Sequence, residues 1–143
     1  MQNCDIVHII TFSQFVPLIR ARVPKTRIVL QMQCQWLEQI DAAVIEPRIN
    51  SADLVLGCSN FIAEGVRRRF FSLAGRCHYA YNGADIAFFA RPSSVQPKPK
   101  QILFVGRLYP EKGVHILLDS FRIVLAQHPD AHLQLIGPIN VVP

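Results

Sequence analysis

The chain has 143 residues, half of them hydrophobic, and a formal net charge of +5 from 15 basic and 10 acidic residues. This composition excludes a disordered chain, and the length suffices for one ordinary domain or for parts of two. No apolar run approaches the length of a membrane helix, and the N-terminus lacks the basic segment and apolar core of a signal peptide. We therefore expect a cytoplasmic protein whose charge favours an anionic ligand or an acidic membrane surface over nucleic acid.

Short apolar runs alternate along the chain with segments of helical or irregular pattern. The runs that have the length of buried strands are residues 5–10, 27–32, 53–58, 77–81, 101–106 and 132–137. Continuous apolar runs of this length are typical of parallel sheets, and their alternation with helices is typical of α/β proteins. The sequence therefore predicts an α/β fold with parallel sheets.

The four cysteines, Cys4, Cys34, Cys58 and Cys77, are widely spaced. They form no CxxC pair and have no histidine at ligand spacing, so neither a metal site nor a disulfide framework is indicated. We expect reduced thiols, most of them buried.

A helix is predicted after the run at residues 53–58. Ser59 suits an N-cap, and apolar residues recur at helical spacing from Ile62 to Phe70. Arg67, Arg68 and Arg69 are consecutive on this helix. Their run indicates a solvated basic face or, alternatively, contact with an acidic membrane or a phosphorylated acceptor.

Residues 91–100, RPSSVQPKPK, are rich in Pro, Ser and Lys and show no periodicity. Such a composition is typical of an interdomain linker, and we place a boundary near residue 97, which gives domains at 1–97 and 98–143. The upstream half is short of strands before Asp5, and one strand-helix-strand unit after the linker cannot cover both faces of its own sheet. We expect both domains to be incomplete.

The segment FVGRLYPEKGVHILLDSF at residues 104–121 carries the clearest chemistry. An apolar strand ends at Gly106, Arg107 and Lys112 follow, and a helical pattern begins after Gly113. Two cations and a helix N-terminus at the end of a strand form a site at which diphosphates bind. An ordinary surface loop that carries two cations is the alternative.

Five motifs occur in a consistent order: DIVHII at 5–10, RIVLQMQCQW at 27–36, ADLVLGCS at 52–59, YNGAD at 81–85 and the segment at 104–121. In these motifs the chain resembles the retaining glycosyltransferases of family 4, also called glycosyltransferase group 1. The resemblance implies a GT-B fold, in which two Rossmann-like domains face each other across a cleft. It also implies transfer of a hexose from a nucleotide-sugar to a sugar, lipid-linked or other acceptor, with retention of configuration.

On the donor side, the resemblance implies that Gly106, Arg107 and Lys112 hold the diphosphate of the nucleotide-sugar. Arg107 and Lys112 are the implied catalytic residues, because they can stabilise the negative charge that develops on the departing diphosphate. This arrangement requires neither a metal ion nor another cofactor. Peripheral contact with an acidic membrane is compatible with it, and no nucleic-acid partner is indicated.

On the acceptor side, the resemblance places Asn82 and Gly83 near the cleft, although a structural turn with positive φ at Gly83 accounts for them equally well. Family members usually carry a histidine at the position of Gln33, and Gln cannot take a proton. His8 is a candidate for a cleft position at a strand end, with a core or turn histidine as the alternative.

Two other classes of function are weighed against the transferase. The family's paired glutamates would fall beyond Pro143, so a truncated, non-catalytic relic or a nucleotide-binding module is one alternative, and we expect this chain to be inactive on its own. A dinucleotide oxidoreductase is disfavoured because no G-x-G-x-x-G follows a predicted strand.

Overall fold

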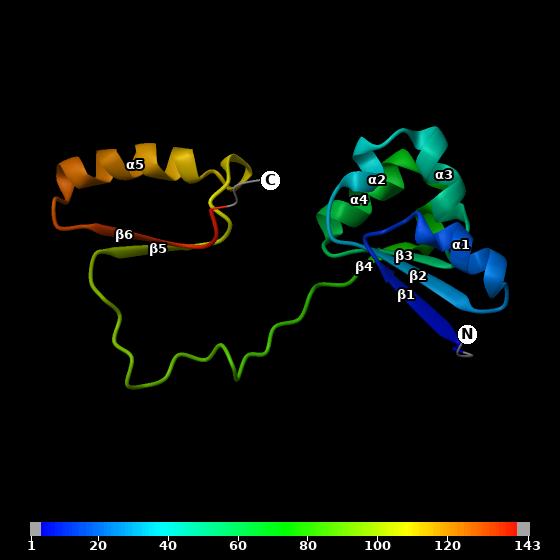
Figure 1. Cartoon of the computed structure of the whole chain (residues 1–143), viewed down its shortest axis with the longest axis horizontal. Coiled ribbons are helices and arrows are strands. Elements are labelled where there is room, and N and C mark those ends of the chain that lie inside the picture. Colours follow the sequence, from blue (N-terminus) through cyan, green and yellow to red (C-terminus); the bar gives the residue numbers. More distant parts are fainter. Residues whose placement is uncertain (1–3, 140–143) are drawn as a thin grey trace. The chain divides into compact units, whose positions relative to one another are not determined.

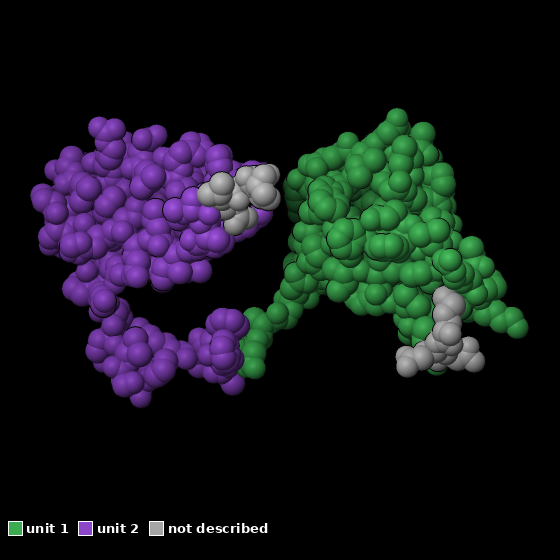
Figure 2. Space-filling model, in the orientation of Figure 1, with its two compact units in different colours: residues 1–86 green, residues 87–143 purple. Residues whose placement is uncertain are grey.

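The computed structural model describes residues 4–139 and divides the chain into two compact units, unit 1 at residues 1–86 and unit 2 at residues 87–143 (Figure 2). Each unit contains parallel strands and helices, which confirms the predicted α/β class. The units are divided after Ile86, upstream of the proline-rich stretch, and the domain boundary near residue 97 stays a prediction.

Unit 1 is a four-stranded parallel sheet with helices packed on it (Figure 1). Its strands are β1 (Ile6–Ile10), β2 (Arg27–Met32), β3 (Leu54–Gly57) and β4 (Cys77–Tyr79), paired in that order. Its helices are α1 (Phe15–Arg22), α2 (Trp36–Gln39), α3 (Ala42–Asn50), α4 (Asn60–Arg69) and the 3-10 helix η1 (Phe71–Arg76). The strands follow the predicted runs closely, except that β4 ends two residues before the predicted end at residue 81.

The core of unit 1 lies on the face of the sheet that carries α1 to α4 (Figure 1). One row across the four strands joins Ile9, Leu30, Val55 and Cys77, and all four side chains are buried. Side chains alternate between the faces of a strand, so the neighbouring residues point to the other face. Ile10 on that other face is 53% exposed, which shows that one face of the sheet carries the packing.

Asp53 joins three elements at the start of β3. Its carboxylate accepts hydrogen bonds from the Ile28 N–H at 2.7 Å, from Arg20 and from Arg27. Burial raises the pKa of Asp53, but the hydrogen bonds from Ile28, Arg20 and Arg27 outweigh burial and hold the pKa below its ordinary value. The ionised carboxylate therefore stabilises the junction of α1, β2 and β3.

The start of α4 has the predicted N-cap. The Ser59 hydroxyl accepts a hydrogen bond from the Ile62 N–H at 3.4 Å. A side chain at Gly57, the last residue of β3, would lie 2.6 Å from the Ala63 backbone nitrogen. The absence of a side chain at Gly57 thus lets α4 pack directly against the end of β3.

The arginine run on α4 is neither a wholly solvated face nor a free basic patch. Arg67 donates to the Cys77 carbonyl and pairs with Glu64, and Arg69 donates to the carbonyls of Glu38 and Ile40. Both arginines are therefore bound within unit 1, so the run is not a solvated face as a whole, and contact with an acidic membrane or a phosphorylated acceptor stays a prediction. Glu64 lies on α4 itself, whereas the carbonyl partners lie on β4 and at the end of α2, where the last carbonyls of a helix lack helical donors.

The expectation that most thiols are buried is wrong. All four cysteines are free, but Cys4 is exposed and Cys34 and Cys58 are half-buried. Cys34 and Cys58 follow the ends of β2 and β3, where the chain leaves the core. Cys77 alone among them is buried, and burial raises the pKa of its thiol.

Unit 2 consists of a parallel pair of strands, β5 (Gln101–Val105) and β6 (His132–Ile136), with α5 (Val114–Gln127) and the 3-10 helix η2 (Pro110–Lys112). Figure 1 shows α5 along one face of the two strands. Residues 80–100, which connect β4 to β5, are exposed throughout. Within the described part of unit 2, Val114 and Ala131 are the hydrophobic residues that are buried.

Candidate functional site

The loop from Gly106 to Gly113, called the donor loop here, connects β5 to α5. The first residues of the loop run alongside the end of β6. The Gly106 N–H donates to the Ile136 carbonyl at 2.9 Å, and the Leu108 N–H donates to the Pro138 carbonyl at 3.0 Å. The loop therefore leaves from the carboxyl end of two parallel strands, which is where α/β sheets bind ligands.

The end of the donor loop leads directly into α5. Gly113, with φ of 70°, is the N-cap residue of α5 and forms no side-chain cap. A glycine adopts this left-handed conformation without strain. No side-chain acceptor therefore caps the N–H groups of the first turn of α5, a position that favours an anion.

Arg107 and Lys112 are both exposed on the donor loop. The Arg107 guanidinium carbon lies 5.6 Å from the centre of the Tyr109 ring, a distance at which a cation and an aromatic ring attract each other. Within residues 4–139, neither Arg107 nor Lys112 forms an ion pair. Both charges are thus available to an anionic ligand, and Tyr109 limits the freedom of the guanidinium.

Gly106 and Gly137 lie side by side at the ends of β5 and β6. A side chain at Gly137, whose φ is 155°, would overlap the Gly106 carbonyl, so this position requires glycine. A side chain at Gly106 would meet only the Phe104 ring, at 3.3 Å. The packing therefore depends on Gly137, a requirement that the sequence reasoning missed, and it leaves Gly106 free for close approach by a ligand.

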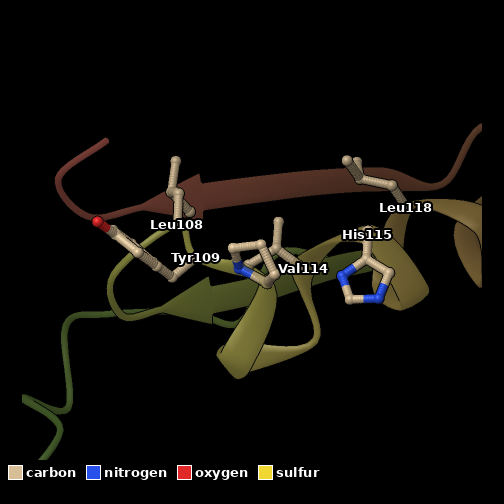
Figure 3. Close-up of a pocket in the computed structure, with 6 residues that line it drawn as sticks. Leu108, Tyr109, Val114, His115 and Leu118 are labelled. Atoms are coloured by element: carbon tan, nitrogen blue, oxygen red, sulfur yellow. The ribbon is translucent and has the colours of Figure 1, made fainter. Parts of the chain in front are cut away.

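A shallow hollow of about 520 Å³ lies between the donor loop and the first two turns of α5 (Figure 3). It is lined by Leu108, Tyr109, Pro110, Val114, His115 and Leu118. Most of these side chains are apolar, and Arg107 and Lys112 do not line the hollow. The two cations and the hollow are therefore separate features of the same loop.

The acceptor-side residues Gln33 and Asn82 come together at the carboxyl edge of the unit 1 sheet. The Asn82 Nδ2 group donates to Gln33 Oε1 at 2.7 Å, and the Gln33 Nε2 group donates to Asn82 Oδ1 at 3.3 Å. Gln33 follows β2 and Asn82 follows β4, so this amide pair spans the end of β3. The structure thus joins two of the candidate residues.

Two other acceptor-side expectations are wrong in their structural details. His8 lies in the middle of β1 beside Val29 and is exposed, so it is neither at a strand end nor in the core. Gly83 lies in an irregular segment with no assigned turn and does not have positive φ, so it does not form the expected turn. The backbone conformation at Gly83 therefore does not require a glycine.

Unit 2 thus combines parallel strands with a cation-bearing loop that leads into an uncapped helix, an arrangement that suits an anionic ligand at strand ends. Known proteins that are similar to this chain indicate what class of protein it resembles. Residues 85–141 match the family model described as Glycosyl transferases group 1. This region contains the whole donor loop.

The chain is also similar to curated proteins over most of its length. It is 27% identical to "Putative glycosyltransferase YtcC" and 26% identical to "Spore coat protein SA", both of Bacillus subtilis (strain 168), and each alignment covers 93% of this chain. A shorter alignment, over 39% of the chain, is 37% identical to "Phosphatidyl-myo-inositol mannosyltransferase" of Mycobacterium tuberculosis.

The family match and the relatives together show that the chain is similar to group 1 glycosyltransferases, most directly over residues 85–141. The chain spans about two fifths of the length of the two Bacillus relatives, 37% and 40% respectively. Within the described residues, no helix is both long enough and apolar enough to cross a bilayer.

Proposed function

We propose that this chain forms part of a glycosyltransferase that moves a hexose from a nucleotide-sugar to an acceptor with retention of anomeric configuration. The observation that carries the proposal is the donor loop, where Arg107, Lys112 and the uncapped start of α5 occur together within the segment that matches the family model. The relatives named as glycosyltransferases support the same reaction class.

The donor loop offers three kinds of group to a diphosphate. Gly106 lets phosphate oxygens approach the backbone, Arg107 offers a planar fork of donors, and Lys112 adds a mobile point charge. The N–H groups at the start of α5 add partial positive charge. Such a set suits a ligand with two adjacent phosphates better than a single carboxylate.

In the proposed reaction, the bond between the sugar's anomeric carbon and the diphosphate oxygen breaks, and its electron pair remains on the diphosphate. An acceptor hydroxyl forms the new bond to the same carbon. Arg107 and Lys112 stabilise the growing negative charge, so the step does not depend on a metal ion. The acceptor's proton passes to an oxygen of the departing diphosphate, because Gln33 is an amide and cannot act as a base at neutral pH.

The acceptor in this proposal is a sugar or a lipid-linked sugar, and the lipid-linked case would involve peripheral contact with a membrane. The mannosyltransferase relative, whose printed name includes a phosphatidylinositol, supports the lipid-linked case. The binding of Arg67 and Arg69 within unit 1 leaves Arg68 as the exposed arginine of that run for contact with acidic lipid.

Isothermal titration of the 143-residue chain with UDP and with GDP tests the donor site directly. We expect one of the two to bind, and we expect Arg107→Ala and Lys112→Ala each to weaken binding by about tenfold, the effect of losing a charge-assisted hydrogen bond. Arg122→Ala on α5 is the matched control, because it removes the same charge from an exposed site in the same unit. Equal binding by all three variants would contradict the assignment.

The reaction itself is tested in a longer protein that contains this chain. Arg107→Ala and Lys112→Ala should lower turnover by about 100-fold or more, the size expected when charge stabilisation at a departing group is removed. NMR of the product's anomeric proton should show the configuration of the donor. Nucleotide binding without any transfer would favour the alternative, a non-catalytic nucleotide-binding module.

A further inference from the structure

Tyr109 lies in the middle of the donor loop, and its backbone connects the two cations of the loop. The Tyr109 N–H donates to the Arg107 carbonyl at 2.9 Å, and the Lys112 N–H donates to the Tyr109 carbonyl at 3.0 Å. Pro110, the first residue of η2, follows Tyr109 and has a fixed φ. The loop therefore turns tightly on both sides of Tyr109, and the backbone positions of Arg107 and Lys112 both depend on this residue.

The Tyr109 ring also contacts the side chain of Arg107. The guanidinium carbon lies over the ring, 5.6 Å from its centre, and Tyr109 is half-buried whereas Arg107 is exposed. Figure 3 shows Tyr109 on the donor-loop side of the hollow and His115 and Leu118 on the α5 side. A tyrosine side chain has only two rotatable bonds, so its half-buried ring gives the longer and more mobile arginine a fixed surface.

The kind of partner determines what Arg107 can still offer to a ligand. A carboxylate would neutralise the guanidinium and occupy its N–H donors, often two at once. An aromatic ring attracts the cation through its face and adds no negative charge. In the part of the chain that the structure describes, Arg107 is paired with no carboxylate. The ring therefore restricts the guanidinium while its charge stays uncompensated and its N–H donors stay available to an anion.

We propose that Tyr109 is a positioning residue of the donor loop, whose ring holds the Arg107 guanidinium in place for a diphosphate before the diphosphate binds. Without the ring, an exposed arginine loses the freedom of a long side chain each time a ligand binds. The ring removes part of that entropy in advance, so affinity rises although Tyr109 need not touch the ligand. The inference rests on the proposed function, since the diphosphate would belong to the nucleotide-sugar.

Calorimetric titration of the intact 143-residue chain with UDP, with GDP and with inorganic pyrophosphate tests this role. Tyr109→Leu should weaken the binding of these compounds by about fivefold, the size of an exposed cation–π contact. Tyr109→Phe should stay within about twofold of the parent chain, because the ring remains. Leu118→Ala is the control, since it removes apolar surface from the α5 side of the same hollow. Equal affinity of Tyr109→Leu and the parent chain would overturn the proposal.

A double-mutant cycle separates the positioning of Arg107 from a general effect on the loop. In an Arg107→Ala background the ring has no guanidinium to hold, so Tyr109→Leu should change affinity by less than about twofold. In a Lys112→Ala background the guanidinium is present, and the loss of about fivefold should persist. An equal loss in both backgrounds would mean that Tyr109 supports only the fold of the loop, and would reject the proposal.

NMR of the chain without any added ligand tests the contact itself. An aromatic ring shifts the resonances of protons above its face upfield, so the Cδ protons of Arg107 should move downfield in Tyr109→Leu and stay in place in Tyr109→Phe. Equal hydrogen exchange of the α5 amides in the three proteins verifies that unit 2 keeps its fold. Identical Arg107 resonances in Tyr109→Leu and the parent chain would reject the contact and the proposal with it.

This inference and the proposed function fail in different ways. Nucleotide binding that Tyr109→Leu leaves unchanged would reject the role of Tyr109 and leave the donor-site proposal intact. Pyrophosphate binding that depends on Tyr109 through Arg107, without binding of UDP or GDP, would keep the role of Tyr109 and argue against a nucleotide-sugar donor. Failure of UDP, GDP and pyrophosphate to bind would reject both.

Discussion

Unit 1 and unit 2 are built from similar apolar strands and helices, but they differ sharply in how much of that apolar surface is buried. Sixteen hydrophobic residues form one buried cluster in unit 1. In the described part of unit 2, Val114 and Ala131 are the buried hydrophobic residues, and Leu103, Val105 and Ile136 on its strands are each more than 40% exposed.

The contrast shows that an apolar pattern determines the type of an element, whereas burial depends on what covers it. Four strands with α1 to α4 on one face enclose a core, but two strands with one helix have too little area to do so. The donor loop thus lies on the weakly packed unit and the amide pair on the well-packed one. A diphosphate that binds the donor loop should therefore order unit 2 more than unit 1.

The difference in packing between the units is tested most directly by removing the same side-chain volume from each sheet. Leu30→Ala in β2 should lower the free energy of unfolding of unit 1 by about 3 kcal/mol, because Leu30 is fully buried and its loss leaves a cavity. Urea unfolding followed by Trp36 fluorescence measures this change, since the chain has one tryptophan.

The matched change in unit 2 is Leu103→Ala in β5, where the leucine is 56% exposed. We expect Leu103→Ala to lower the free energy of opening of unit 2, measured by hydrogen exchange of the α5 amides, by less than about 0.5 kcal/mol. If Leu103→Ala were as damaging as Leu30→Ala, unit 2 would have a core of its own, and the contrast between the units would be wrong.

A second test compares two aspartates. Asp53→Ala should destabilise unit 1 by about 2 kcal/mol at neutral pH, because it leaves Ile28, Arg20 and Arg27 without their shared acceptor. Asp130→Ala should change little, because the Lys100 and Asp130 side chains are 52% and 64% exposed. Trp36 fluorescence measures the unfolding of unit 1, and exchange of the α5 amides measures the opening of unit 2.

The lowered pKa of Asp53 also predicts how the stability of unit 1 depends on pH. The pKa of Asp53 is lowered by folding, so its stabilising contribution is present above the ordinary Asp pKa, about 3.9. That contribution is lost as the pH falls through the lower pKa of the folded state. The parent chain should therefore lose more stability on acidification below about pH 4 than Asp53→Ala does. Parallel pH profiles of the two proteins would refute the role of the ionised carboxylate.

The strands could be predicted from the sequence almost to the residue, because strands of a parallel sheet are continuous apolar runs. The start of α4 could also be predicted, since an N-cap such as Ser59 acts locally. Burial of Leu103 or Cys34 could not be predicted, because it depends on elements elsewhere in the fold. The motif indicated Arg107 and Lys112, and their role stays a prediction.

Long-range partners explain what the sequence could not show. Gln33 and Asn82 are separated by 49 positions and meet only because β2 and β4 lie on either side of β3. Arg69 finds its carbonyl partners 29 to 32 positions earlier in the chain. The need for glycine at Gly137 arises from contact with Gly106, 31 positions away as numbered in the sequence. No local pattern records any of these contacts.

The smallest expected effect compares how helices are held in the two units. Arg69 on α4 donates to the carbonyls of Leu37 and Ile40 at 3.2 and 2.7 Å, so Arg69→Ala should destabilise unit 1 by about 1 kcal/mol. Arg122→Ala on α5 and Arg68→Ala on α4 remove the same charge from exposed positions, and neither should change the stability of its unit by more than about 0.5 kcal/mol. Urea unfolding read by Trp36 measures the α4 variants, and exchange of the α5 amides measures Arg122→Ala. An equal loss for Arg68→Ala and Arg69→Ala would mean that net charge, and not the bonds to α2, accounts for the effect, and α4 would then be held no more firmly than α5.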